Sequence, residues 1–329
     1  MVNVLEVKGL TTQFSKGSGK VTVVDQLDLH LKKGESLGIV GESGCGKSVT
    51  SLSIMRLLDS NGTVTGSIRL NGRDILRLNE KEMRDIRGKE MAMIFQEPMT
   101  SLNPVLTIGR QISEVLEEHE GRSKAACKQR VIDLLAQVGI ARPEEIYREY
   151  PHSLSGGMRQ RVMIAMAIAC NPSLLIADEP TTALDVTIQA QILDQIKKIR
   201  DEIGMSLIMI THDLGVVAEV CDRVMVMYAG QVIESADVRT LLRNPKHPYT
   251  IGLNQSTPQK AKGQKRLYSI TGNVPSPEDM PPGCRFAPRC DKVMTICWEK
   301  NPELQQVDQL SACRCWLYQV NKESSVVNA

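Results

Sequence analysis

Hydrophobic positions in the first hundred residues follow the period of β-strands. Short runs rich in Val, Ile, Leu and Met begin near Val4, Val21, Ser36, Gly66 and Met91. Glycines next to Lys or Asn separate several of these runs, as expected of turns. We therefore predict a series of short strands before residue 98.

The period changes to that of a helix between about residues 107 and 140. Val131, Leu134, Leu135 and Val138 recur at the spacing of one helix face, and charged residues flank them. This pattern predicts an exposed helical insert.

Strand-like and helix-like segments alternate further along the chain. Apolar runs begin at Leu174, Ser206 and Val224, and a polar helix is predicted for about residues 187–202. Strands bounded by helices at this spacing imply a parallel sheet covered on both faces, and hence an α/β core.

The pattern weakens after about residue 236. Residues 254–283 are rich in Pro, Ser, Gly and Lys, which is typical of a linker or an open loop. Their short basic run is interpreted as solvated, with contact to anionic lipid or a partner as the alternative. It comprises Lys260, Lys262, Lys265 and Arg266. At roughly 150 residues per domain, the chain suggests two domains, or one large domain with an appendage.

Composition argues against several classes of protein. The 40 basic and 38 acidic residues leave a net charge of +2, which disfavours a nucleic-acid surface over the whole chain. The longest apolar run, nine residues from Val162 to Cys170, is well short of the roughly 18 that span a membrane. Because the N-terminus shows no secretory signal, we expect a reducing cytoplasmic location where the cysteines form no disulfides.

A phosphate-binding motif follows the strand predicted near Ser36. Residues 41–48 match G-x-x-x-x-G-K-[ST] and lead into a predicted helix, which is the context the motif requires. Backbone N–H groups and the helix N-terminus favour anions there. Lys47 would reach the β- and γ-phosphates, and Ser48 would bind Mg²⁺. Cys45 is interpreted as a small filler. The predicted nucleotide-binding residues of this segment are Gly41, Glu42, Ser43, Gly44, Cys45, Gly46, Lys47, Ser48 and Val49.

Two acids end the apolar strand that begins at Leu174. Burying adjacent carboxylates is costly unless they face a cation or water. We interpret Asp178 as the Mg²⁺ partner and Glu179 as the base that polarises the attacking water. The alternative is that the pair caps the next turn.

A second anion-binding segment precedes the apolar helix that starts near residue 158. Ser155, Gly156 and Gly157 present backbone N–H groups at a helix N-terminus. This Leu-Ser-Gly-Gly segment, about twenty residues before Leu174, resembles the signature motif of ABC-type ATPases. The resemblance covers about residues 4–235.

The resemblance implies further roles. Gln96 resembles the Q-loop glutamine, His212 the switch histidine, and residues 183–185 the D-loop. Phe14, placed in the turn after the first strand, would stack on adenine. The family forms head-to-tail dimers in which the phosphate loop of one subunit and the signature of the other enclose the γ-phosphate. The implied catalytic residues are Glu179, His212 and Gln96, and the implied Mg²⁺ ligands are Ser48, Gln96 and Asp178.

The implied fold is an α/β P-loop NTPase of the ABC cassette type. It comprises a RecA-like parallel-sheet core, an antiparallel β subdomain and an α-helical signature subdomain. We expect the cassette at residues 1–235, with the helical subdomain at about 98–165. A small Cys-rich extension follows at residues 236–329.

Five of the nine cysteines fall within 32 residues near the C-terminus. They are Cys284, Cys290, Cys297, Cys313 and Cys315. Four converging thiolates can hold zinc or an iron–sulfur cluster, and the spacing alone leaves zinc, a cluster and free thiols open.

A narrower resemblance involves residues 244–253 and the cysteines that follow. These segments are similar to the C-terminal extension of ATP-binding subunits of bacterial dipeptide, oligopeptide and nickel importers. The resemblance implies a [4Fe–4S] cluster held by Cys284, Cys290, Cys297 and Cys315. Cys313 is the alternative fourth ligand, and zinc is the alternative metal.

The resemblance implies an ATP-hydrolysing subunit of an importer of di- or oligopeptides, peripheral on the cytoplasmic face of the membrane. Its partners would be two permease subunits, a like or sister ATPase and an external substrate-binding protein, with no nucleic acid. The helical insert after Pro98 would dock on the permeases. The alternatives are nickel or glutathione import, an exporter ATPase, or a soluble ABC ATPase in DNA repair, iron–sulfur assembly or translation.

Overall fold

The computed structural model describes residues 2–17, 19–96, 101–182, 184–257 and 268–319. Two compact units make up the chain. The first contains Met1–Glu6, His30–Ser36 and Ile68–Met209, and the second contains Val7–Leu29, Leu37–Ser67 and Ile210–Ala329. The basic run at Lys260–Arg266 lies outside the described residues.

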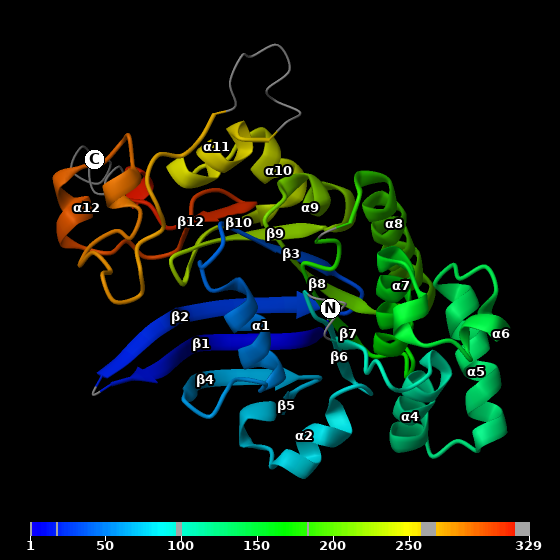
Figure 1. Ribbon diagram of the computed structural model, residues 1–329. Helices are drawn as coiled ribbons and strands as arrows, with labels where there is room; N and C mark the ends of the chain where they lie inside the picture. The colour runs from blue at the N-terminus through cyan, green and yellow to red at the C-terminus, as the bar shows by residue number, and fades with distance from the viewer. Residues whose placement is uncertain (1, 18, 97–100, 183, 258–267, 320–329) are drawn as a thin grey trace. The chain divides into compact units, whose positions relative to one another are not determined.

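The first unit carries most of the helices that were predicted from periodicity (Figure 1). Its elements are β5 (Arg73–Asp74), η1 (Ile75–Arg77), α2 (Glu80–Ile86), β6 (Met91–Ile94), α4 (Ile108–Glu120), α5 (Lys124–Gln137), α6 (Pro143–Ile146), η2 (Pro151–Ser153), α7 (Gly156–Ala167), β7 (Leu174–Asp178), α8 (Val186–Ile203) and most of β8 (Ser206–Thr211). Strands β6 and β7 pair in parallel, with Met91 opposite Leu174.

The predicted helical insert is two helices. Gly121, with φ of 61°, ends α4, and the Ser123 hydroxyl accepts a hydrogen bond from the Ala126 N–H at the start of α5. The predicted apolar face of α5 is fully buried, because α5 packs against α4 and α7. The helical spacing of apolar residues therefore identified the buried face of α5 correctly. The insert divides into two helices because Gly121 adopts a left-handed conformation and Ser123 caps the next helix.

The second unit holds the remaining strands and the residues that follow Asp237, here named the C-terminal segment. Its elements are most of β1 (Asn3–Lys16), β2 (Gly19–Lys32), β3 (Ser36–Val40) and β4 (Gly62–Leu70), together with α1 (Lys47–Met55), α9 (Leu214–Val220), β9 (Arg223–Tyr228), β10 (Gln231–Asp237), α10 (Val238–Arg243), α11 (Pro248–Gln255), η3 (Ala287–Arg289), α12 (Thr295–Glu299), β11 (Gln305–Gln306) and β12 (Ser311–Cys313).

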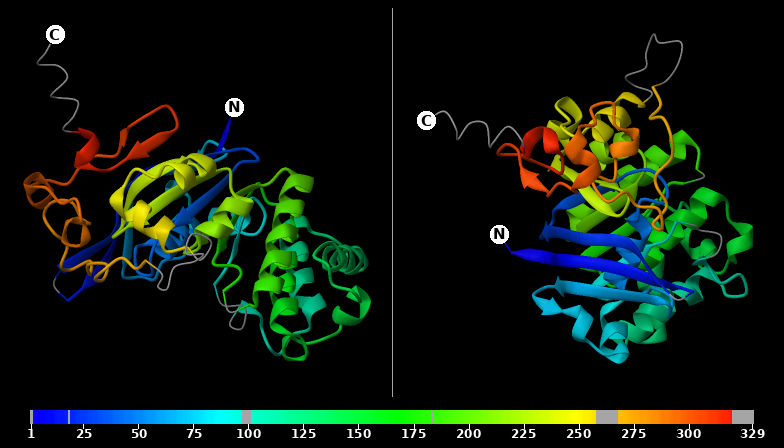
Figure 2. Two further views of the ribbon diagram at one scale, coloured as in Figure 1. Left: turned by 90° about the horizontal axis from the view of Figure 1, so that it is seen from above. Right: turned by 90° about the vertical axis from the view of Figure 1, so that its left-hand side faces the viewer.

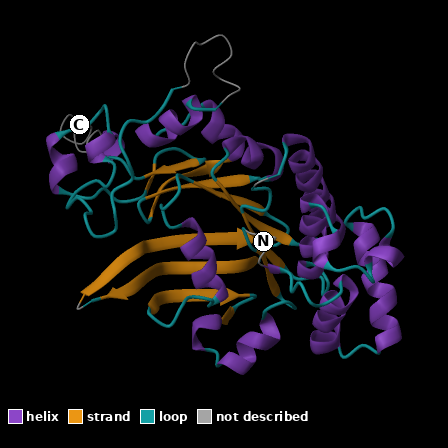
Figure 3. Cartoon of the chain, viewed as in Figure 1, coloured by secondary structure: helices purple, strands orange, loops and turns teal. Residues whose placement is uncertain are grey.

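Parallel and antiparallel pairing both occur among the strands (Figure 3). Strand β3 pairs in parallel with β9, β9 forms an antiparallel hairpin with β10, and β12 continues the sheet beside β10. A separate sheet has the order β2-β1-β4-β5. The predicted α/β class, with a parallel core and an antiparallel β subdomain, is thus confirmed.

An aromatic cluster anchors the C-terminal segment to β9 and β10. Tyr228, Tyr249 and Phe286 are buried, and the Phe286 ring meets those of Tyr228 and Tyr249 edge-on, with centroids 5.2 and 5.5 Å apart. Helix α10 packs on β9 and β10 nearby (Figure 2). Such pairs stabilise a fold by about 0.5–1.5 kcal/mol each beyond their buried area.

No helix in the described ranges is both long and apolar enough to cross a lipid bilayer.

Gly66 and Gly72 both have positive φ, but only Gly66 is closely packed. Comparing substitutions at these positions separates the stability cost of backbone strain from the cost of a steric clash. At Gly66 (φ 106°) an added Cβ would lie 2.6 Å from the Lys8 and Gly9 carbonyl oxygens, whereas at Gly72 (φ 81°) it would meet nothing within 4 Å. We predict that Gly72→Ala lowers the free energy of unfolding by about 1 kcal/mol, and Gly66→Ala by about 2–4 kcal/mol. Urea unfolding of both variants measures this difference. Equal losses would contradict the close backbone approach at Gly66.

Candidate functional site

The phosphate-binding motif forms the turn between β3 and α1, as predicted. All five residues of β3 are buried, and Lys47 is the first residue of α1. Gly44 and Gly46 have φ of 80° and 100°, a region that favours glycine. At Gly41 a Cβ would lie 2.3 Å from the Met227 carbonyl oxygen, so only glycine lets this turn approach β9.

The Lys47 ammonium and the Cys45 thiol are both enclosed by this loop. Lys47 is only 6% exposed, and its ammonium donates hydrogen bonds to the carbonyl oxygens of Gly41 at 2.8 Å and Glu42 at 3.0 Å. Cys45 is fully buried, and burial raises the pKa of its thiol. A neutral, inaccessible thiol is a poor nucleophile, which agrees with the interpretation of Cys45 as a filler. Ser43 and Gly44 are exposed, and Ser48 and Val49 are half-buried.

Two of the predicted catalytic residues meet in the first unit. The Gln96 side-chain amide donates to Glu179 Oε2 at 3.2 Å, and the Thr182 hydroxyl donates to the same oxygen at 2.9 Å. Glu179 has φ of 47°, a strained conformation for a residue with a side chain. Asp178, at the end of β7, is 4% exposed. These bonds orient the Glu179 carboxylate directly after the buried strand.

The signature segment forms the N-terminus of α7. The Ser155 hydroxyl accepts a hydrogen bond from the Met158 N–H at 3.3 Å, and Gly156 and Gly157 are the first helical residues. Ser155 and Gly156 are exposed. A Cβ at Gly157 would lie 2.9 Å from the Ile188 side chain, so this glycine lets α7 approach α8 closely. The amides of this helix start therefore lie at the surface of the chain.

Phe14 and His212 belong to the second unit, with the phosphate loop. His212 is exposed and directly follows β8. The prediction that Phe14 lies in a turn after the first strand is wrong, because β1 continues to Lys16 and contains it. The apolar run near Val4 predicted too short a strand, because five of residues 11–16 are polar and only Thr12 among these six is buried. Of the predicted D-loop, Ala183 lies outside the described residues, and Asp185 caps α8.

The C-terminal cysteines are all free thiols, and three of the five are buried. The Cys284 N–H donates to the Cys297 carbonyl oxygen at 2.7 Å, and the Met294 N–H donates to Cys297 Sγ at 3.5 Å. Burial raises the pKa of Cys315 to about 12, and the neighbouring thiols add to this rise. Those neighbours are Cys284, Cys290 and Cys297.

These thiols are electrostatic neighbours, but they do not form a site for a single ion. Within the described ranges, no group of three or more His, Cys, Asp or Glu side chains is placed to hold a metal ion. The described thiols therefore give no direct support to either zinc or an iron–sulfur cluster. Cys313, on β12, lies opposite the buried Glu234 of β10.

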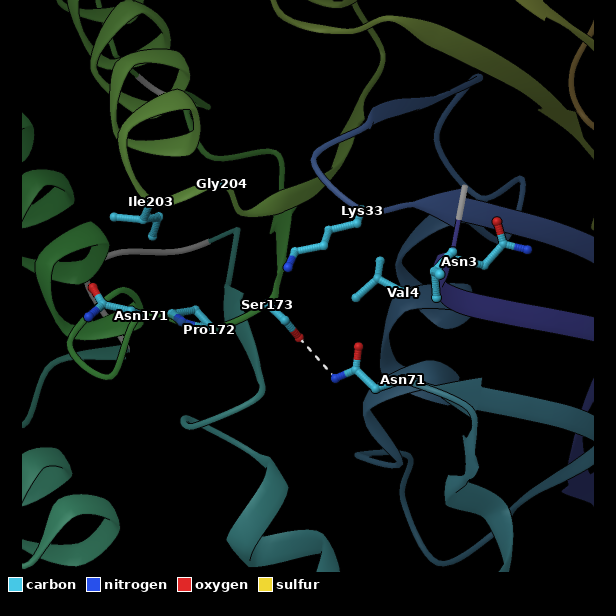
Figure 4. Close-up of a pocket in the computed structure, with 10 residues that line it drawn as sticks. Asn3, Val4, Lys33, Asn71, Asn171, Pro172, Ser173, Ile203 and Gly204 are labelled. Atoms are coloured by element: carbon cyan, nitrogen blue, oxygen red, sulfur yellow. Dashed lines mark hydrogen bonds between the residues drawn. The ribbon is translucent and has the colours of Figure 1, made fainter.

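A pocket of about 400 Å³ is lined by residues of the first unit (Figure 4). Lys33, Asn71 and Ser173 are among its lining residues, and the Asn71 amide donates to Ser173 Oγ at 3.3 Å. None of the residues predicted to bind nucleotide lines it.

Two family descriptions match the chain. Residues 24–182 match the ABC transporter family, and residues 233–297 match the C-terminal region of oligopeptide/dipeptide transporters. The first range contains the phosphate loop, the signature and Glu179.

Curated relatives match nearly the whole chain. The oligopeptide transport ATP-binding protein AppD of Bacillus subtilis is 54% identical over 97% of this chain and 98% of the relative. The dipeptide transport ATP-binding protein DppD of Haemophilus influenzae is 51% identical over 92% of each chain. The chain belongs to the family of ABC transporter ATP-binding proteins.

A solved structure agrees with this membership. A dimeric ATP-binding cassette in a post-hydrolysis state, bound to ADP and Pi, superposes with a TM-score of 0.64 at 29% identity. The match covers 71% of this chain and 99% of that cassette. As a member of this family, the present chain is an ATP hydrolase, and its substrate is ATP with Mg²⁺.

The buried carboxylate of Glu234, which holds the start of α11, was not predicted from the sequence of this ABC protein. The fully buried Glu234 carboxylate accepts hydrogen bonds from the N–H groups of Lys246 at 2.7 Å and His247 at 2.8 Å. His247 Nδ1 in turn accepts from the Tyr249 N–H at 3.0 Å, which caps the helix. The sequence did contain a signal for this contact: Glu234 directly follows apolar residues of β10, and a buried acid needs hydrogen-bond donors.

Burial lowers the pKa of His247 to about 3, against an ordinary value near 6.5. The folded chain therefore keeps this histidine neutral, while the unfolded chain protonates it as the pH falls below 6.5. Stability is lost between pH 6.5 and 3, by about 1.4 kcal/mol between pH 7.5 and 5.5. We predict that His247→Asn, whose side-chain oxygen can accept the Tyr249 N–H in place of Nδ1, removes this pH-dependent component.

Urea unfolding at the two pH values measures this component. His152→Asn is the matched control, because His152 is exposed. If the pH dependence of His247→Asn equalled that of the unmodified chain, the assignment to His247 would be wrong.

Proposed function

We propose that the chain is the ATP-hydrolysing subunit of an ABC importer that takes up di- or oligopeptides. The observation that carries this proposal is the match of residues 233–297 to the oligopeptide/dipeptide transporter C-terminal region, together with relatives at about 50% identity over nearly their whole length. The proposed division is a cassette at residues 1–235 followed by an extension.

The proposed chemistry is phosphoryl transfer to water. Mg²⁺, held by Ser48, Gln96 and Asp178, would neutralise phosphate charge. Lys47 exchanges its bonds to loop carbonyl oxygens for phosphate oxygens when ATP binds, and Glu179 takes the proton of the attacking water. The bond from Gln96 to Glu179 Oε2 supports this role, because it leaves the carboxylate oriented after β7.

A second subunit completes the proposed site. Ser155 and Gly156 are exposed at the start of α7, so their amides are accessible to the nucleotide of another subunit. In this arrangement His212 and the signature amides stabilise charge on the γ-phosphoryl group, and Phe14 packs on adenine. The solved cassette that this chain resembles is dimeric.

The proposed partners are two permease subunits and an external substrate-binding protein. The chain would bind the cytoplasmic face of the membrane, because it belongs to a transporter family and no described helix spans a bilayer. The helical insert formed by α4 and α5 is the proposed docking surface, since it follows Gln96 in sequence.

We also propose that the C-terminal thiols bind a [4Fe–4S] cluster, which would crosslink a lobe with little core of its own. Cys284, Cys290, Cys297 and Cys315 are the proposed ligands. The mutual electrostatic influence of these four thiols supports the proposal. Cys315 is the proposed fourth ligand because three other thiols raise its pKa, whereas Glu234 has a larger effect on the pKa of Cys313 than Cys315 or Cys284.

Glu179→Gln tests the assignment of the base. The change keeps the size of the side chain and removes its ability to accept the proton of water, so we predict that steady-state hydrolysis falls by at least about a hundredfold. ATP binding should change by less than about threefold. Phosphate release and nucleotide titration measure the two effects.

Glu219→Gln is the matched control, because Glu219 is exposed on α9. Turnover retained by Glu179→Gln would disprove the assignment.

Iron and sulfide analysis of anaerobically purified chain tests the cluster. We predict about four irons and four sulfides per chain, and loss of both on Cys297→Ser, while Cys127→Ser retains them. Cys127 is a buried thiol of α5 and provides a matched control. Stoichiometric zinc without iron or sulfide would overturn the proposal.

A further inference from the structure

Arg289 joins the C-terminal segment to the phosphate loop. Its side chain is only 5% exposed, and its guanidinium donates to Glu42 Oε2 at 3.1 Å and to the Tyr228 hydroxyl at 3.3 Å. Glu42 is the second residue of the loop. The other carboxylate oxygen of Glu42 is buried and has no hydrogen-bond partner among the described residues. Arg289 therefore supplies the charge that compensates this carboxylate.

Hydrogen bonds from all three of its nitrogens hold the Arg289 side chain. Its Nε donates to the Thr271 carbonyl oxygen at 3.0 Å, and Nη2 donates to the Ile270 carbonyl oxygen at 3.3 Å. The guanidinium carbon lies 5.7 Å from the centroid of the Tyr228 ring. A planar group with three nitrogens engaged loses little freedom when it binds one more acceptor. The ion pair with Glu42 is thus preorganised.

Tyr249 holds the backbone of the same loop residue. Its hydroxyl accepts a hydrogen bond from the Glu42 N–H at 2.9 Å, and the side chain is fully buried. Burial raises the pKa of Tyr249, so the hydroxyl stays neutral. The position of Tyr249 depends on the Glu234 and His247 contacts at the start of α11. The C-terminal segment therefore fixes both the side chain and the amide of Glu42.

A further contact reaches the other side of the loop. Arg285 pairs with Asp25 and donates to the Ala229 carbonyl oxygen at 2.5 Å. The next residue, Gly230, donates its N–H to the Cys45 carbonyl oxygen at 2.9 Å. This contact places the β9–β10 turn against the loop.

We propose that the C-terminal segment positions the phosphate loop for ATP, and that Arg289 is the positioning residue. The link to nucleotide is Lys47, because its ammonium bonds to the carbonyl oxygen of Glu42. Fixing the Glu42 peptide fixes the loop from which Lys47 reaches the phosphates. The inference rests on ATP binding at this loop and is independent of the transported substrate.

A double-mutant cycle on the full-length chain tests the proposal. The variants are Arg289→Gln, Glu42→Gln and the pair of changes together. We expect Arg289→Gln to raise the KM for ATP about tenfold and to leave kcat within about twofold, because the residue touches neither the γ-phosphate nor the water. Once Glu42 is neutral, adding Arg289→Gln should change KM by less than about twofold.

Lys292→Gln is the matched control, because it removes one positive charge from an exposed side chain of the same segment. Its KM should equal that of the unmodified chain. If Arg289→Gln does not fold, Tyr249→Phe provides the second measurement. It removes only the acceptor of the Glu42 N–H and should raise KM several-fold.

Two results would overturn the proposal. One is an unchanged KM for Arg289→Gln in a folded chain, and the other is fully multiplicative effects of the two single changes. A KM that rises as expected in a chain that does not support peptide uptake would count against the importer function alone, because nucleotide binding is measured without permeases.

Discussion

Two glycines of the second unit allow close backbone approaches around the phosphate loop, and the predicted nucleotide site depends on them. A Cβ at Gly41 would lie 2.3 Å from the Met227 carbonyl oxygen, and one at Gly230 would lie 2.3 Å from that of Val23. These distances leave no room for any side chain. The phosphate loop, the first half of β2 and the β9–β10 turn can therefore meet only because glycine occupies these positions.

That convergence determines which residues surround the loop. Because the β9–β10 turn lies against Cys45, the elements attached to it also come close to the loop. Tyr228 ends β9 and contributes to the aromatic cluster with Tyr249 and Phe286. The C-terminal segment, whose composition differs from the rest of the chain, thus packs on β9 beside the phosphate loop. A substitution in its core is expected to shift the position of Glu42.

The placement of three motifs on strands and helices was predicted correctly, because it depends on neighbours in sequence. The 41–48 loop, the two acids at the end of β7 and the start of α7 each combine specific residue types at short, fixed spacing within one turn or one helix end. The long range of β1 was missed, since Phe14 and its neighbours lack the apolar alternation of a buried strand. The pairing of Arg289 with Glu42 was also missed, because 247 positions separate the two residues. Glu42 occupies a variable position of the loop motif, and Arg289 belongs to no local pattern.

Strand β12 has a consequence for how the chain folds during synthesis. It pairs with β10 through Glu234 opposite Cys313, yet it leaves the ribosome about 75 residues later, which takes roughly 4–15 s at usual elongation rates. During that interval one edge of β10 has unpaired backbone groups, and exposed edges of this kind promote association between chains. A nascent chain stalled before residue 311 is therefore expected to be more prone to aggregation than the completed one.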